Sequence, residues 1–191
     1  MQRRSVIKGL LGATGIGLVA GTCGYNYVKS PTGFTGEELA QYEGLLAELV
    51  DVIIPPSDTP GAKEAQVHHY ILSYMKNCST DKEYRNFYYG LKEIETFSVN
   101  NVGISFQYCS MKQKTELLRG VFNEELGNAT LRKIKTKLRG NSFAHLLKKL
   151  TVEGYCQSRL GATEHLAYQP IPGKYEAITE LKPNQPCWAT K

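Results

Sequence analysis

The residues that most often carry out chemistry in proteins are sparse in this chain. Its four histidines are His68, His69, His145 and His165, and none lies at the spacing of a known metal-binding motif. His68 and His69 are neighbours, which places them on different faces of a helix. The chain also lacks a G-x-S-x-G elbow, a P-loop and the protein-kinase signatures. We therefore expect no catalytic residue and no metal site.

Four cysteines follow the first 30 residues: Cys78, Cys109, Cys156 and Cys187. None forms a C-x-x-C or C-x-x-C-H motif, so their spacing indicates neither a metal site nor haem attachment. Four cysteines in an exported protein allow three disulfide pairings, and the sequence does not choose among them. Structural disulfides and free buried thiols therefore both remain open.

The N-terminal residues have the pattern of an export signal. Arg3 and Arg4 are followed by an apolar pair and Lys8, and residues 9–28 contain no charge. A basic start before a short apolar segment is typical of a secretory signal, and the two adjacent arginines resemble a twin-arginine signal. We predict that residues 1–30 are a twin-arginine signal peptide and linker, read by the twin-arginine translocase, and that the protein is periplasmic.

Two alternatives for this N-terminal segment stay open. The uncharged stretch is just long enough to span a bilayer, so it could instead anchor the protein at the inner membrane. Cys23 could carry a lipid, although Ala20 and Thr22 before it make a poor lipoprotein signal. The cleavage site is not indicated.

The positive net charge of +5 is unevenly distributed. Residues 1–30 carry four basic side chains and no acidic one, and residues 111–150 hold ten Lys and Arg against three Glu. Such a stretch could bind an acidic partner or lipid, but it has few aromatic residues and no recognisable nucleic-acid module. We predict that it forms the solvated faces of helices and that nucleic acid is not a partner.

Apolar residues recur at helical spacing through most of the chain. A Ser or Thr followed three residues later by Glu or Gln predicts helix starts at Thr35, Thr80 and Ser110. Pro55 and Pro56 end the first helix, and residues 99–103 are expected to be a loop. The predicted helices cover residues 35–54, 67–75, 80–98, 110–126, 131–138 and 143–155. The hydrophobic content of 41% suits one domain, so we predict an all-α fold, a small multi-helix domain over residues 31–156.

Residues 157–191 have a different character. They contain four of the eight prolines and also Tyr168, Tyr175 and Trp188. A Pro-rich segment that keeps its aromatic residues differs from a flexible linker. We predict an irregular, Pro/Gly-rich C-terminal arm that lies extended and ordered on a surface. Earlier in the chain, Pro60 and Gly61 at the centre of a turn favour type II.

Two motifs and the N-terminal signal together resemble a known family. The first motif is LVDVIIPPSDTPGA over residues 49–62, with Pro55, Asp58, Pro60 and Gly61. The second begins with TVEGY over residues 151–155 and continues toward the C-terminus. Its positions include Ser158, Gly161, Ala162, Leu166, Tyr168, Pro170, Pro172, Gly173 and Tyr175, with Trp188 near the end. The chain resembles the gluconate 2-dehydrogenase subunit 3 family. The resemblance covers both ends of the chain after the signal, and residues 78–148 match only as generic helix.

This resemblance implies a non-catalytic small subunit with no cofactor of its own. It implies a large FAD-containing partner, a sugar or polyol dehydrogenase of the glucose–methanol–choline type, which this subunit binds, stabilises and exports in folded form. A cytochrome c subunit with haem c is implied as a third component that accepts electrons. Arg3, Arg4 and Lys8 then belong to the shared export signal, and the residues of the two motifs contact the partner. The substrate would bind to the large subunit.

The residues also allow functions of other classes. A stand-alone exported or membrane-anchored helical binding protein is the main alternative, and it would be a stable monomer when made alone. An enzyme that uses His145, His165 and Cys156 directly is a third reading, which no motif favours.

Overall fold

The computed structural model describes residues 37–125 and 140–171, and residues 173, 178, 180, 181 and 183–189 of the arm. Several predicted features lie outside these residues: Arg3, Arg4, Lys8, Cys23, Thr35, the basic helix over residues 131–138, and Pro172. The signal peptide and the cap at Thr35 therefore stay predictions.

Helices make up most of the described chain. A 3-10 turn, η1 (Ala40–Tyr42), precedes α2 (Glu43–Ile53), and α3 (Val67–Asn77) follows a loop. The remaining elements in chain order are α4 (Asp81–Val102), η2 (Phe106–Tyr108), α5 (Met111–Glu125), α7 (Phe143–Gln157) and η3 (Gly161–His165). The predicted all-α fold is confirmed, since an isolated bridge between Ala167 and Trp188 is the one strand-like pairing among the described residues.

The predicted helix caps at Thr80 and Ser110 are confirmed. The Thr80 hydroxyl accepts a hydrogen bond from the Glu83 amide at 3.4 Å, and the Glu83 carboxylate accepts one from the Thr80 amide at 3.2 Å. Ser110 and Gln113 make the same reciprocal pair ahead of α5. Each pair satisfies two backbone amides that have no partner inside the helix.

Two predicted boundaries were wrong. Among the described residues the first α-helix begins at Glu43, and residues 37–42, which were predicted to be α-helical, form turns instead. In these turns Leu39 is buried and Glu38 accepts a hydrogen bond from the Tyr84 hydroxyl. The predicted loop over residues 99–103 is helical as far as Val102. Gly103 ends α4 with a φ of 83°, a conformation that glycine adopts without steric cost.

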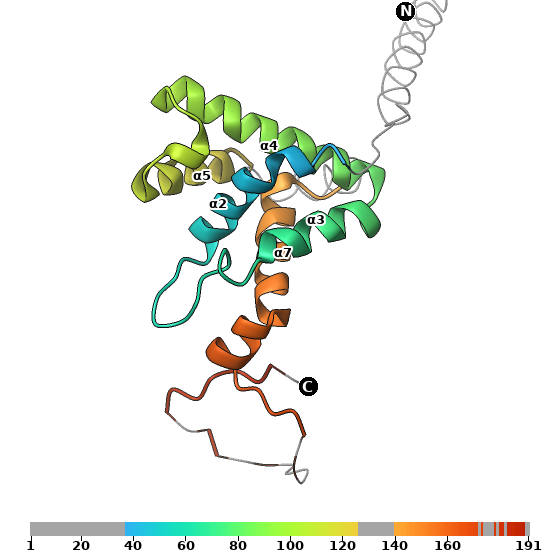
Figure 1. The fold of residues 1–191 in the computed structure, drawn as a ribbon, viewed down its shortest axis with the longest axis vertical. Coiled ribbons are helices and arrows are strands. Elements are labelled where there is room, and N and C mark those ends of the chain that lie inside the picture. The colour runs from blue at the N-terminus through green and yellow to red at the C-terminus, as the bar shows by residue number, and fades with distance from the viewer. Residues whose placement is uncertain are drawn as a thin grey trace, which may run out of the picture. The chain divides into compact units, whose positions relative to one another are not determined.

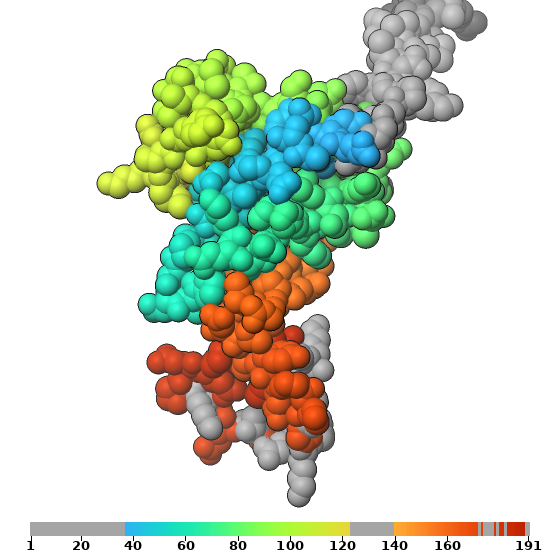
Figure 2. Space-filling model, in the orientation of Figure 1, coloured from blue at the N-terminus to red at the C-terminus, as the bar shows by residue number. Residues whose placement is uncertain are grey.

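The core lies between α7 and the helices around it. Helix α7 contacts α2, α3, α4 and α5, and Figure 1 shows it running from among these helices to the arm. Its buried residues Leu146, Leu147 and Leu150 meet apolar side chains of the other helices, such as Leu49 and Phe87. The arm follows α7, and Figure 2 shows its described residues beyond the end of that helix. The core thus fixes the position of α7, and the arm begins beyond its C-terminal end.

Candidate partner-binding surface

The first motif forms a tight loop after α2. Helix α2 ends at Ile53, and the Ala62 amide then donates a hydrogen bond to the Ile54 carbonyl at 2.9 Å. Inside this closure the Ser57 amide donates to the Thr59 carbonyl at 3.0 Å. Pro55 and Asp58 are both exposed in this loop. The loop therefore presents these two side chains to solvent on a fixed backbone.

The predicted type II turn at Pro60 and Gly61 was wrong. A type II turn needs a positive φ at its third position, and Gly61 is not among the glycines with positive φ. A Cβ atom at Gly61 would lie 2.8 Å from the backbone nitrogen of Pro56. Gly61 is therefore required because the two arms of the loop approach closely, and not because of its backbone angles.

Tyr155 joins the two motifs. Its hydroxyl donates a hydrogen bond of 2.7 Å to the Pro60 carbonyl, across 95 residues of chain. The side chain is only 2% exposed, and its ring lies 5.7 Å from the ring of His165. The loop after α2, the end of α7 and η3 are therefore connected through one tyrosine. Tyr155 belongs to the second motif, but nothing in the sequence indicates this contact.

Gly161 allows the chain to turn directly after α7. The Ser158 hydroxyl accepts a hydrogen bond from the Gly161 amide at 3.0 Å and donates one to the Tyr155 carbonyl at 2.7 Å. A Cβ atom at Gly161 would lie 2.0 Å from that same Tyr155 carbonyl oxygen. Any other residue would force this turn open, so Gly161 fixes the direction in which the arm leaves α7.

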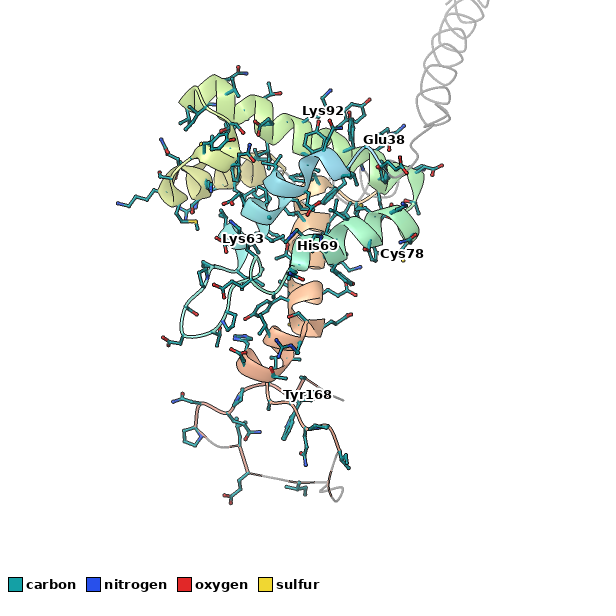
Figure 3. The ribbon with its side chains drawn as sticks, viewed as in Figure 1. Glu38, Lys63, His69, Cys78, Lys92 and Tyr168 are labelled. Carbon is teal, nitrogen blue, oxygen red and sulfur yellow. The ribbon has the colours of Figure 1, made fainter. Side chains whose placement is uncertain are left out.

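The arm is closed into a loop at its two ends. The Ala167 amide donates to the Cys187 carbonyl, and the Ala189 amide donates to the Ala167 carbonyl, both at 2.8 Å. These bonds pair the backbone of Ala167 with that of Trp188. The closed loop contains Tyr168, which Figure 3 shows away from the helices, and Gly173.

The apolar side chains of this arm are open to solvent. Ile171, Ile178 and Leu181 are 82%, 93% and 83% exposed, and Tyr168 and Trp188 are about half exposed. These side chains are not covered by the described helices of the chain, and the predicted arm lying on a surface stays a prediction. Within the described residues, no helix has both the length and the apolar character that are needed to cross a membrane.

A charge cluster lies beside the first motif. Lys63 and Lys114 each donate a hydrogen bond to the Glu48 carboxylate, at 2.5 and 2.6 Å. Burial raises the pKa of Glu48, but the hydrogen bonds from the two lysines outweigh it, and the pKa is lowered. Burial raises the pKa of the neighbouring Asp51. Lys114 is buried, so it is an exception to the predicted solvated face of the basic stretch.

The four cysteines are free thiols in this structure. Cys109 is buried, with its sulfur 3.4 Å from the Ser98 hydroxyl, and Cys156 is half-buried. Cys78 and Cys187 are exposed. The sequence left structural disulfides and free buried thiols open. The structure contains free thiols at these four positions, and Cys109 is the one that is buried.

The prediction that His68 and His69 face apart was wrong. Their ring centroids are 4.2 Å apart, and His69 Nδ1 lies 3.7 Å from the Glu43 carboxylate. Gln66, directly before α3, has a left-handed φ of 55°. Burial, and next the nearby His69, lower the pKa of His68. His145 is exposed and is remote from this group in the sequence.

The described residues thus define a small all-helical protein whose two sequence motifs meet at the end of α7, where a closed apolar arm begins. The model of gluconate 2-dehydrogenase subunit 3 matches residues 40–173. The chain belongs to this family, and the resemblance seen in the motifs is confirmed. Comparisons with curated proteins and with solved structures found no match.

The family match covers all of the first motif and part of the second. The first motif and the second motif as far as Gly173 lie inside the matched residues. Trp188, which closes the arm, and the N-terminal signal lie outside them. The segment 78–148, for which the sequence indicated only generic helix, lies inside the match as well. The family match therefore covers all of the described helices.

Proposed function

We propose that this chain is a non-catalytic small subunit that binds, stabilises and co-exports a large FAD-containing dehydrogenase of the glucose–methanol–choline type. The family name supports association with a gluconate dehydrogenase. Arg3, Arg4 and Lys8 direct the folded pair through the twin-arginine pathway to the periplasm. FAD belongs to the partner, and a cytochrome c subunit with haem c receives the electrons.

The exposed apolar arm is the observation that carries this proposal. Ile171, Ile178 and Leu181 are each more than four-fifths exposed. Burying an aliphatic side chain of this size is worth about 1.5–3 kcal/mol, and apolar groups gathered at a surface mark interaction sites. These three residues make no contribution to the core of the chain itself, and a partner protein that covered them would gain this free energy.

The first motif supplies a rigid base beside the arm. Tyr155 ties the loop of residues 54–62 to the end of α7, from which the arm starts. Pro55 and Asp58 are exposed on that loop. A surface that is already fixed before binding loses less conformational entropy when the partner docks. We propose that this loop and the arm contact the large subunit together.

The direct test is a pull-down of the tagged full chain from the periplasm of its native host, with an absorbance spectrum and masses of the bound proteins. We expect a larger protein with a flavin spectrum. The double variant Ile178→Ser and Leu181→Ser should lose it, because the apolar contact is removed. The control Tyr108→Ser, at an exposed apolar position outside the arm, should retain it.

Export is tested separately by the variant Arg3→Lys with Arg4→Lys. We expect the flavoprotein to remain in the cytoplasm, because the signal is shared by the pair. Normal export of the flavoprotein in this variant would contradict the escort role. A lone, colourless and monomeric chain in the pull-down would contradict the whole proposal and would favour the stand-alone binding protein.

A further inference from the structure

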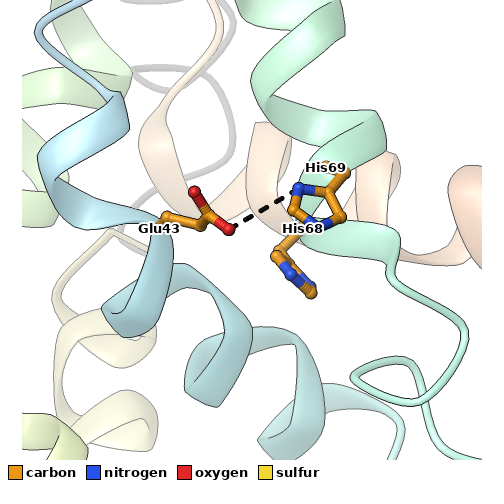
Figure 4. A group of neighbouring side chains, drawn as sticks. All are labelled: Glu43, His68 and His69. Carbon is orange, nitrogen blue, oxygen red and sulfur yellow. Dashed lines mark ion pairs between the residues drawn. The ribbon is translucent and has the colours of Figure 1, made fainter.

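A group of three potential metal ligands lies between the starts of α2 and α3. Glu43 is the first residue of α2, and His68 and His69 lie in the first turn of α3. One ligand atom from each side chain lies within 4.8 Å of the other two. Figure 4 shows the Glu43 carboxylate directed at His69, with the ring of His68 beside it. The three side chains therefore converge from two helices on one small volume.

The ligand types and their distances suit a transition-metal ion. Zn²⁺ is bound by imidazole nitrogen and carboxylate oxygen at about 2.0–2.2 Å, which places tetrahedral ligand atoms roughly 3.3–3.6 Å apart. The three ligand atoms lie no more than 4.8 Å apart, and His69 Nδ1 is already 3.7 Å from the Glu43 carboxylate. Glu43 and His69 are both exposed, so side-chain rotation alone can close the difference. The backbone that presents the ligands does not have to move.

His68 adds an independent observation. Its Nδ1 atom is buried and has no hydrogen-bond partner, and it is one of two such side-chain atoms among the described residues. A buried polar atom without a partner is unfavourable and rare in folded proteins. A neutral imidazole nitrogen in this position can be satisfied by a metal ion, for which histidine is the commonest ligand.

The charges around the three ligands have opposing effects on a bound cation. The N-terminal end of α3 carries a partial positive charge, which opposes a cation, and Glu43 supplies the compensating negative charge. Lys63 is nearby in the sequence, but its ammonium group is held by Glu48 at 2.5 Å. Direct ligand bonds act at shorter range than these opposing charges. The setting therefore favours a site of moderate affinity, and not one that holds its ion irreversibly.

We propose that Glu43, His68 and His69 form a binding site for a divalent transition-metal ion of the Zn²⁺ class. The ion ties the start of α2 to the start of α3, the two helices that flank the loop of the first motif. With three protein ligands at an exposed position, a fourth coordination position stays open to solvent. This proposal does not depend on the function proposed above.

The test uses the full chain, stripped of metal with a chelator and with any purification tag removed. Titration calorimetry with Zn²⁺ should give one ion per chain. The variants His69→Ala and Glu43→Gln should weaken binding at least about tenfold, since even residues that only support a metal ligand contribute 10–100-fold. The control variants His145→Ala and Glu93→Gln, at exposed positions on other helices, should bind as the unchanged chain does.

A second readout identifies the ligands. Co²⁺ in place of Zn²⁺ should give weak visible bands without the intense thiolate-to-metal band that cysteine ligands produce. That intense band would place the ion on a cysteine and would overturn the proposal. So would equal Zn²⁺ affinity in the His69→Ala variant, or no binding by the unchanged chain. Circular dichroism of each variant establishes that a loss of binding is not a loss of fold.

Discussion

Removal of the Tyr155 hydroxyl tests whether the two motifs stabilise each other. The variant Tyr155→Phe keeps the ring, its burial and its contact with His165, and removes only the donor to the Pro60 carbonyl. An intramolecular hydrogen bond contributes about 0.5–1.5 kcal/mol, and a buried carbonyl left without a donor adds to the loss. Pro60 is only half-buried, so water can partly replace the donor. We expect a loss of about 1–2 kcal/mol.

The assay is urea unfolding of the full chain followed by far-ultraviolet circular dichroism. The midpoint should fall while the slope with denaturant stays constant, because the surface exposed on unfolding is unchanged. Each kcal/mol corresponds to about 2–4 °C in melting temperature for a chain of this size. The matched control is Tyr108→Phe, at an exposed tyrosine, which should stay within about 0.5 kcal/mol of the unchanged protein.

A Tyr155→Phe variant as stable as the Tyr108→Phe control would refute this reasoning. The loop of the first motif would then be stabilised by its own hydrogen bond between Ala62 and Ile54. The hydrogen bond to α7 would contribute nothing to the free energy of unfolding. A loss well above 3 kcal/mol would also contradict it, because one hydroxyl cannot account for that much without a rearrangement of the core.

Three further predictions follow from the same structure. Gly61→Ala should lower the unfolding free energy by about 1–3 kcal/mol in the same urea assay, because its Cβ would lie too close to a backbone atom. At Gly120 a Cβ would make an ordinary van der Waals contact with the Phe97 ring at 3.6 Å, so the control Gly120→Ala should be neutral or stabilising by up to about 1 kcal/mol. Because the pKa of Glu48 is lowered, its ion pairs stabilise the fold above pH 4.5 and lose this effect as the pH falls through the lowered pKa. The unfolding free energies of the unchanged chain and of Glu48→Gln should therefore converge in acid. A constant difference between the two free energies at every pH would contradict this. Burial, and next the hydrogen bond with Glu38, raise the pKa of Tyr84 to about 12. The stability that the neutral Tyr84 side chain contributes is therefore complete below pH 10 and is lost as the pH rises toward 12. In Tyr84→Phe the unfolding free energy should fall less steeply over this alkaline range.

The features that the sequence predicted well are local ones. The caps at Thr80 and Ser110 depend on residues three positions apart, and both partners are visible in the sequence. The same reasoning failed at residues 37–42, where Leu39 and Glu38 contact parts of the chain far away in sequence. Helix periodicity therefore located the described helices, but it did not show that α2 begins only at Glu43.

The features that the sequence missed depend on distant partners. In the sequence nothing distinguishes Lys114 from the other basic residues of its stretch. In the structure it donates a hydrogen bond to Glu48, 66 positions earlier. His68 and His69 approach Glu43 because α3 packs on α2, and this packing has no signature in the sequence. The motif residues themselves could be located in advance, but the contact of Tyr155 with Pro60 could not.

The residue that closes the arm, Trp188, is also a natural fluorescent probe. Trp188 is the only tryptophan in the chain, and it lies in the arm, 57% exposed and apart from the helical core. Its fluorescence should therefore resemble that of a largely hydrated indole and respond little to unfolding of the helices. An apolar surface that covered the arm should shift this emission to shorter wavelength. Tryptophan emission and helical circular dichroism thus report separately on the arm and on the core of the same unlabelled chain.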